Sequence, residues 1–195
     1  MRHVFTALAF AMLVGGCDAP ATETAPAAAA IETNYTVIPE ESHIRFSSEQ
    51  EGEPFTGEFT EFDARIYYDA DDIDVQVLIP LASVRAGSTD RNSTLPGPAW
   101  FDVKAFPVAE FRANELSDMT TRDGKPIALG TLTMKGISAD VSLPFRLTEE
   151  NGRTVMEGQT SIMRTDWNVG AAPWDTDEYV RRRVDLDVRI VATRD

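Results

Sequence analysis

The chain has 195 residues, with 18 Lys or Arg against 32 Asp or Glu, so its formal net charge at pH 7 is −14. A strongly acidic surface repels phosphate backbones, which argues against a nucleic-acid partner. The sequence has one cysteine, which excludes an intramolecular disulfide and a cysteine-based metal site.

The N-terminus has the pattern of an export signal. A basic start at residues 1–3 precedes an apolar or small-residue run at 4–16, shorter than the roughly 20 residues that a membrane-spanning helix needs. Val14-Gly15-Gly16-Cys17 resembles the bacterial lipobox, which implies cleavage before Cys17 and acylation of its thiol. The resemblance implies a protein anchored at the periplasmic face of a bacterial membrane, and Asp18 resembles the signal for retention at the inner membrane. An ordinary signal peptide with an incidental cysteine is the alternative.

The segment after the signal is a tether. Residues 17–33 are rich in Ala, Pro and Thr and lack an amphipathic pattern, so we predict a lipidated flexible linker. Residues 34–195 are long enough to bury one hydrophobic core. The predicted organisation is therefore a signal peptide at 1–16, a linker at 17–33 and one folded domain at 34–195.

Period-two alternation of apolar residues dominates the folded part and predicts antiparallel strands. Helix signals are poor, and only residues 95–106, limited by prolines, have room for a short helical turn or a structured loop. Many short strands in one domain predict an all-β sandwich or barrel. The clearest alternating sets are Val75, Val77 and Ile79; Val141, Leu143, Phe145 and Leu147; and Val184, Leu186, Val188 and Ile190.

Turn signals separate these strands. Asp123-Gly124, Lys135-Gly136 and Asn151-Gly152 are typical of tight turns. Phe59 and Phe62 have an odd spacing, so we predict a bulge or a register change within residues 57–68.

Five segments, in order along the chain, resemble the YceI family of secreted bacterial proteins. The resemblance implies a single antiparallel lipocalin-like β-barrel of about eight strands, with an apolar interior that holds a polyisoprenoid chain such as a quinone or a polyprenyl phosphate. The matching segments are Glu41-Ser42-His43-Ile44-Arg45-Phe46; Gly57-Glu58-Phe59 with Phe62; residues 100–107 (WFDVKAFP) with Phe111; residues 130–137 (GTLTMKGI); and residues 164–170 (RTDWNVG).

Two positions depart from the family pattern. Arg91-Asn92-Ser93-Thr94-Leu95 stands where the family often has Arg-Asp-x-His-Leu, so no role of that Asp–His pair carries over. Asn168 replaces a usual glycine, and asparagine tolerates a positive φ better than most residues.

The predicted ligand-binding residues are inward-facing aromatic and apolar side chains, several of them carried by the resemblance, and one arginine. No catalytic residue, metal site or cofactor is predicted; a bound isoprenoid lipid or quinone would be a ligand. The set is Phe46, Phe59, Phe62, Trp100, Phe101, Phe106, Phe111, Leu132, Phe145, Arg164 and Trp167.

Polar residues offer few candidates for a catalytic, metal-binding or head-group-binding site. His43 alternates with Ile44 on a strand, which favours a structural role, and the acidic run Asp69, Asp71, Asp72, Asp74 fails the spacing of a calcium loop. Arg164 and Asp166 could form a pair that meets a ligand head group or a purely structural pair. The default for residues 181–183, three consecutive arginines, is neutralisation by nearby acids, with phosphate binding as the alternative.

The sequence thus favours a lipid-anchored carrier or sequestering protein for an isoprenoid-type lipid. One rival is an enzyme acting on such a lipid, which requires His43, Arg164 and Asp166 to converge inside the barrel. The other rival is an envelope interaction or stress protein with a fully packed barrel. Exposed strand edges would also allow a homodimer.

Overall fold

The computed structural model describes residues 31–69 and 72–195. The predicted signal peptide, Cys17, Asp18 and most of the predicted linker lie outside these residues, as does Asp71. A compact unit covers Ile31–Asp195. No helix within the described part is long and apolar enough to cross a membrane.

Strands make up most of the described chain, with one α-helix, α1 (Thr89–Thr94), and three short 3-10 helices, η1 (Pro39–Glu41), η2 (Leu81–Ser83) and η3 (Arg164–Trp167). The strands are β1 (Tyr35–Val37), β2 (His43–Gln50), β3 (Glu53–Phe59), β4 (Asp63–Tyr68), β5 (Ile73–Pro80), β6 (Val84–Arg85), β7 (Val108–Leu116), β8 (Ile127–Met134), β9 (Ile137–Glu150), β10 (Arg153–Met163) and β11 (Arg183–Arg194).

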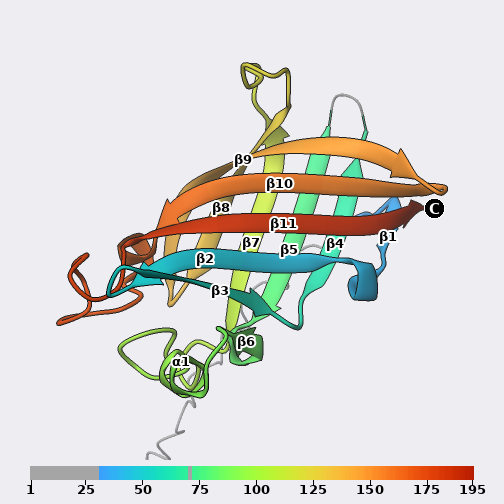
Figure 1. Cartoon of the computed structure of the whole chain (residues 1–195). Helices are drawn as coiled ribbons and strands as arrows, with labels where there is room; N and C mark the ends of the chain where they lie inside the picture. The colour runs from blue at the N-terminus through green and yellow to red at the C-terminus, as the bar shows by residue number, and fades with distance from the viewer. Residues whose placement is uncertain (1–30, 70–71) are drawn as a thin grey trace, which may run out of the picture. The chain divides into compact units, whose positions relative to one another are not determined.

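Eight strands close into an antiparallel barrel. The order is β1-β4-β5-β7-β8-β9-β10-β11, and β11 pairs back to β1. Strands β4, β5, β7 and β8 form one wall, and β9, β10, β11 and β2 cross it in front (Figure 1). This closed ring confirms the predicted barrel.

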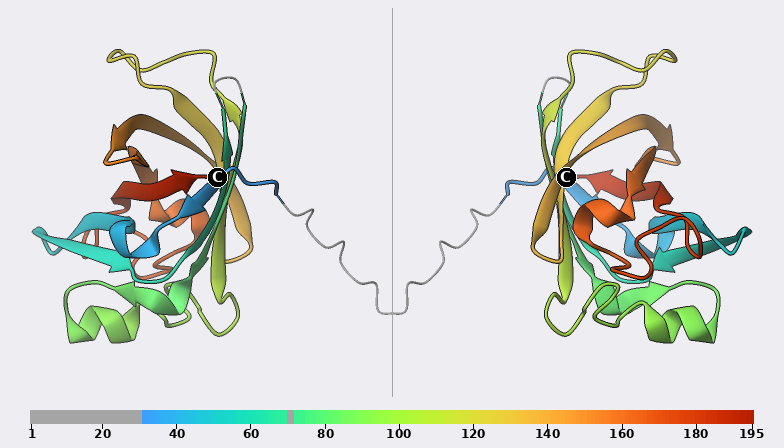
Figure 2. Two further views of the ribbon diagram at one scale, coloured as in Figure 1. Left: turned by 90° about the vertical axis from the view of Figure 1, so that its right-hand side faces the viewer. Right: turned by 90° about the vertical axis from the view of Figure 1, so that its left-hand side faces the viewer.

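β11 is long enough to pair with two different strands along the same edge. Its first half pairs with β2, from Asp185 opposite Ser47 to Arg189 opposite His43. Its last residues pair with β1, which is only three residues long and meets β4 through the single pair Tyr35–Ile66. Strands β2, β3 and β6 therefore continue the sheet from the first half of β11 (Figure 2), and inward side chains of β2 and β3 also line the barrel interior.

The alternating apolar residues face the interior, and the turn residues form tight turns, as the sequence predicts. The inward side chains of β5 are Ile73, Val75, Val77 and Ile79, and those of β11 continue from Val184 to Ala192. At the β9–β10 turn, Asn151 and Gly152 have φ values of 53° and 75°, the left-handed pair that a tight hairpin requires. Asn168 also adopts a left-handed conformation, with φ 53°, so the departure from glycine is accommodated.

One local prediction is wrong. Residues 57–68 are not one strand with a bulge, because β3 ends at Phe59 and β4 begins at Asp63. The main chain of Thr60 bonds to the carbonyl of Ser83 (3.2 Å), which turns the chain between the two strands. The odd spacing of Phe59 and Phe62 thus marks a connection, and the register shift that the ladder does show lies in β7, between Ala113 and Glu115.

The helical turn begins earlier than the predicted window. Ser88 caps α1, because its hydroxyl accepts the main-chain N–H of Arg91 at 3.2 Å. Residues 95–106 form turns rather than a helix, consistent with the loop that the prediction allowed. This loop covers one end of the barrel, where it meets η3 and the segment 168–182.

The two ends of the barrel differ. The tryptophan end is formed by the 81–107 connection, the β8–β9 turn and residues 164–182. The tyrosine end is formed by β1, the β4–β5 and β7–β8 connections, the β9–β10 turn and the end of β11. The alternating strand directions assign these connections to opposite ends.

Candidate functional site

The barrel encloses an apolar cavity of about 240 Å³. Its lining reaches from Trp100 and Phe101 at the tryptophan end to Tyr35 and Tyr68 at the tyrosine end. Along β5 alone the lining extends from Ile73 to Ile79, which corresponds to about 20 Å at roughly 3.3 Å per residue. The cavity is therefore long and follows the barrel interior.

Several interior side chains border empty space. Val75, Val77, Phe111 and Val188 point into the barrel, yet each is only partly buried. Interior side chains of a packed core would instead be in close contact on every side. The barrel is thus hollow, which argues against the fully packed alternative.

Polar atoms are rare in the lining. Apart from the two tyrosines, the polar lining residues are Ser48, Thr154, Thr160 and Arg164. The hydroxyl of Thr154 bonds to Glu149 and that of Thr160 to the carbonyl of Ser142. These groups are already satisfied, so the surface open to a guest is almost entirely hydrocarbon.

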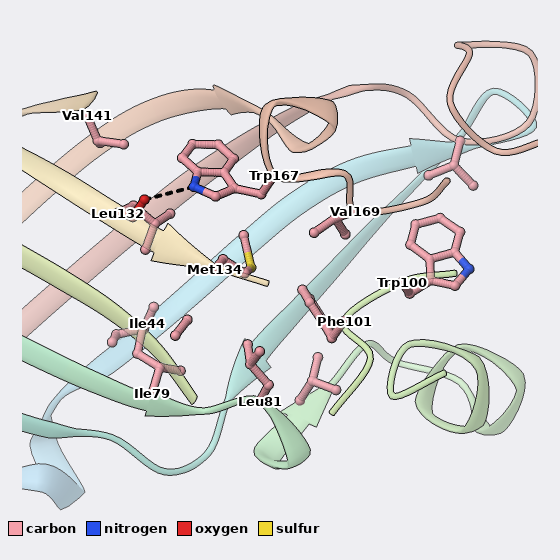
Figure 3. Packing of buried hydrophobic residues seen from close by; sticks show 13 residues of the cluster. Ile44, Ile79, Leu81, Trp100, Phe101, Leu132, Met134, Val141, Trp167 and Val169 are labelled. Atoms are coloured by element: carbon pink, nitrogen blue, oxygen red, sulfur yellow. Dashed lines mark hydrogen bonds between the residues drawn. The ribbon is translucent and has the colours of Figure 1, made fainter. Parts of the chain in front are cut away.

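The tryptophan end is densely packed. Leu81, Phe101, Trp167 and Val169 belong to one cluster there, with exposed fractions of 8% or less, and Figure 3 shows Trp167 directed toward Leu132. The indole Nε1 of Trp167 donates to the carbonyl of Leu132 at 2.8 Å, the dashed line of Figure 3. This contact holds η3 against the wall at β8.

Arg164 holds the closing segment by bonding to main-chain carbonyls. Its side chain is 4% exposed, and its Nη1 donates to Val169 (2.7 Å) and Gly170 (3.2 Å). Burial lowers the pKa of its guanidinium, which stays charged at neutral pH because the ordinary value is so high. Further carbonyls accept from Nη2 and Nε: those of Trp174, Thr176 at 3.3 Å, Val180 at 2.7 Å and Arg181 at 3.2 Å.

The predicted pair between Arg164 and Asp166 is not present. Asp166 is exposed, whereas the guanidinium of Arg164 is occupied by carbonyls and lies 5.3 Å from the Trp100 ring centroid. Arg164 therefore lines the cavity as a structural residue with its donors already used.

Eight of the eleven predicted ligand-binding residues border the cavity and three do not. Phe62 lies in the β3–β4 connection, beside a shallow outer hollow that also involves Arg65. Phe106 packs near Gly136 at the β8–β9 turn, and Trp167 is buried behind the lining. The eight are Phe46, Phe59, Trp100, Phe101, Phe111, Leu132, Phe145 and Arg164.

Lining residues of two kinds were not predicted from the sequence. Tyr35, Phe55 and Tyr68 were not selected. Phe55 and Tyr68 follow the alternation of their strands, whereas β1 is too short to show one. The small residues Ala109, Ala113 and Ala128 leave much of the open space, and small side chains carry a weak hydrophobic signal. Gly130 has a related role, because a Cβ there would lie 2.6 Å from the Phe111 ring.

The residues of the enzyme hypothesis do not converge. His43 faces outward from β2, and its Nε2 lies 2.7 Å from Oδ1 of Asp187 on the outer face of β11. The hydrogen bond from Gln159 and then that from His43 lower the pKa of Asp187. With Arg164 buried and Asp166 exposed on η3, this particular catalytic cluster is not formed.

The remaining charged motifs are surface features. The three arginines at 181–183 bond in turn to Glu49, Asp177 and Asp185, which confirms neutralisation by neighbouring acids. The main chain of Asp72 bonds to Asp69 (3.1 Å) in the β4–β5 connection. Over residues 31–69 and 72–195 no group of three His, Asp or Glu side chains could hold a metal ion.

Comparison with known proteins agrees with this architecture. A solved structure of BcnA from Burkholderia cenocepacia superposes with a TM-score of 0.74 at 28% identity, covering 81% of this chain and all of that one. A polyisoprenoid binding domain from Saccharophagus degradans superposes with a TM-score of 0.66 at 16% identity, covering 84% of this chain and all of that one.

Sequence relatives point the same way. A UPF0312 protein of Yersinia pestis (strain Pestoides F) is 28% identical over 157 residues, which cover 73% of this chain and 79% of the relative. The model of the YceI-like domain matches residues 35–192, nearly the whole folded unit. The chain therefore belongs to the YceI-like domain family.

Proposed function

We propose that this protein binds an isoprenoid-type lipid inside its barrel and carries or sequesters it. The observation that supports this most directly is the long hollow interior with its hydrocarbon lining. Each Å² of apolar surface removed from water contributes about 25 cal/mol, so a long tail binds tightly with few polar contacts. The polyisoprenoid binding domain of Saccharophagus degradans, which shares the fold, supports the choice of lipid.

Native mass spectrometry of protein purified without denaturant tests the proposal. We expect a bound lipid, or uptake of one after incubation with quinones and polyprenyl phosphates. A lipid-free protein that takes up none of these would refute the proposed function.

A pair of variants on neighbouring strands connects binding to the cavity. Ala128→Phe on β8 places a ring in the cavity, because Ala128 is 3% exposed and lines it. Ser142→Phe adds the same ring to β9 between two inward residues, on the exposed outer face. We expect Ala128→Phe to reduce lipid uptake at least tenfold and Ser142→Phe to leave it unchanged, with thermal unfolding curves to show that both variants are folded. Equal uptake by both would contradict binding inside the barrel.

We also propose that the protein works at the periplasmic face of a bacterial membrane, attached through an acylated Cys17. The lipobox-like Val14-Gly15-Gly16-Cys17 supports the anchor, and Asp18 favours the inner membrane. A tether would keep the barrel near the bilayer that supplies a water-insoluble ligand. Metabolic labelling with a fatty-acid analogue should mark the wild type and not Cys17→Ser, and membrane fractionation should release the variant. A labelled Cys17→Ser variant would contradict this site of attachment.

Homodimer formation stays a prediction. It is tested by light scattering, which measures the molar mass of the protein in solution.

A further inference from the structure

The two ends of the cavity are chemically different, which bears on how a ligand lies in it. At the tryptophan end, Trp100 and Phe101 are each 8% exposed, and the N–H groups of Arg164 all donate to main-chain carbonyls. The guanidinium of Arg164 therefore has no N–H group left for a guest, and the indole nitrogen of Trp100 points away from Phe101 (Figure 3). A polar head group placed there would lose its hydrogen bonds to water without replacement, which is unfavourable.

At the tyrosine end, two phenols face the interior. Tyr68 follows Ile66 on the inward side of β4, and Tyr35 lies directly opposite Ile66 on β1. Both side chains are half-buried, and the Tyr68 ring packs edge-on against Phe145 with ring centroids 6.0 Å apart. The two phenols therefore lie at the rim, where a ligand leaves the hydrocarbon interior.

These hydroxyls are available as donors. The main chain of Tyr68 bonds to the Asn34 side chain (2.9 and 3.0 Å), but within residues 31–69 and 72–195 neither the Tyr35 nor the Tyr68 hydroxyl has a hydrogen-bond partner. Burial raises the pKa of the Tyr68 phenol, and Tyr35 raises it further, so the phenol keeps its proton. Tyr67, which faces outward, differs because its hydroxyl already donates to Asp69 at 3.1 Å.

The charge around this rim is mainly negative. The basic residues of the same connections and strand ends are Arg122, Lys125, Arg153 and Arg194. Arg153 is bonded to Glu41, and the Arg194 guanidinium lies 5.9 Å from the Tyr35 ring centroid. A phosphate head, which carries more than one negative charge, would be repelled by the neighbouring carboxylates, whereas a carbonyl oxygen would not. The carboxylates of the connections that form the rim are Asp69, Asp72, Asp118, Asp123, Glu149, Glu150 and Asp195.

We propose that the lipid lies with its polar end between Tyr35 and Tyr68, and that this end accepts an uncharged head with acceptor oxygens, such as a quinone ring, in preference to a phosphate. The inference rests on the proposed function. The tail then extends toward Trp100 and Phe101, and the phenols donate to the oxygens of the head.

Three probes with tails of geranylgeranyl length separate the parts of this proposal: a ubiquinone, a polyprenyl monophosphate and the saturated hydrocarbon phytane. Binding constants are measured for the wild type, for Tyr35→Phe/Tyr68→Phe and for the matched control Tyr67→Phe. Each lost hydroxyl should weaken ubiquinone binding about three- to tenfold. Phytane binding should not change, nor should any binding to Tyr67→Phe.

The outcomes are distinct. If no probe binds to any form, the proposed function fails and this inference with it. If phytane and ubiquinone bind but the double variant binds ubiquinone as tightly as the wild type, the proposed function stands and the tyrosine site is wrong. If the monophosphate binds more tightly than the ubiquinone, and Arg194→Gln removes that advantage, the preference for an uncharged head is wrong.

Orientation is tested by photolabelling with a prenyl lipid that carries a diazirine on its polar end. Peptide mapping should find the label on residues 35–37 or 66–68, and not on β3, whose Phe59 ring lies 5.8 Å from that of Phe101. Label on residues 95–103 would overturn the proposed orientation, because it would place the head at the tryptophan end.

Discussion

Replacing Arg164 by methionine should destabilise the protein strongly, because the guanidinium is the common donor for the segment that closes the tryptophan end. Methionine keeps a long flexible chain and removes all the N–H groups. The carbonyls of Val169, Gly170 and Val180 then lose a buried donor. Trp174, Thr176 and Arg181 lose partners closer to the surface, which water replaces in part.

The magnitude follows from the three buried carbonyls. Leaving a buried acceptor unsatisfied costs about 1–3 kcal/mol. Removing a buried cation that has no carboxylate partner recovers part of this loss, because its desolvation penalty disappears. We expect Arg164→Met to lower the free energy of unfolding by about 3 kcal/mol. At about 2–4 °C per kcal/mol for a chain of this size, the melting temperature falls by about 6–12 °C.

Urea and thermal unfolding measure the effect, with two control variants. Arg164→Lys keeps the charge but has fewer donors, so its free energy of unfolding should lie between those of the wild type and Arg164→Met. Arg181→Met removes an exposed arginine paired with Glu49 and should change stability by less than about 1 kcal/mol. Amide hydrogen exchange should accelerate in residues 168–182 of Arg164→Met before it does in β5 or β8. If Arg164→Met were as stable as Arg181→Met, the hydrogen bonds from Arg164 to the main-chain carbonyls would not stabilise the protein as proposed.

Three further changes should have measurable effects. Trp167→Phe removes the donor to the Leu132 carbonyl and leaves a small void. The free energy of unfolding in urea should therefore fall by about 1–3 kcal/mol. An unchanged value would contradict the role of the indole N–H. Gly130→Ala places a Cβ 2.5 Å from the main-chain oxygen of Arg112, so it should destabilise by about 1–3 kcal/mol, and a stabilised variant in thermal unfolding would contradict the close approach. Asp187 has a lowered pKa in the folded state, so its contribution is present above the unfolded value of about 3.9 and is lost as the pH falls through the folded value. The stability difference between wild type and Asp187→Asn should therefore shrink below about pH 4, and a difference independent of pH would contradict this linkage.

The parts of the fold that follow from local patterning were predictable from the sequence. Alternation in β5, β9 and β11 placed their apolar side chains inside, and Asn151-Gly152 marked a tight hairpin because both positions require a positive φ. Those signals depend on residues close together in the chain. They fix which face of a strand is buried and where it turns.

The rest depends on contacts between distant segments. The role of Arg164 could not be predicted, because its carbonyl acceptors lie up to 17 residues away in a loop with no regular pattern. Phe62 was assigned to the interior because it resembles Phe59 in type, but the chain leaves the sheet between them. Tyr35 was missed because β1 is too short to show an alternation.

The short strand β1 also has a mechanical consequence. It closes the ring through three residues, meets β4 at one register pair, and is joined at its start to the upstream chain through Asn34, whose carbonyl accepts the N–H of Asp195 (3.2 Å). A pulling force applied through the N-terminus would act first on this seam and would load its few hydrogen bonds one after another. The tyrosine end would then yield under tension while the clamped tryptophan end kept its shape.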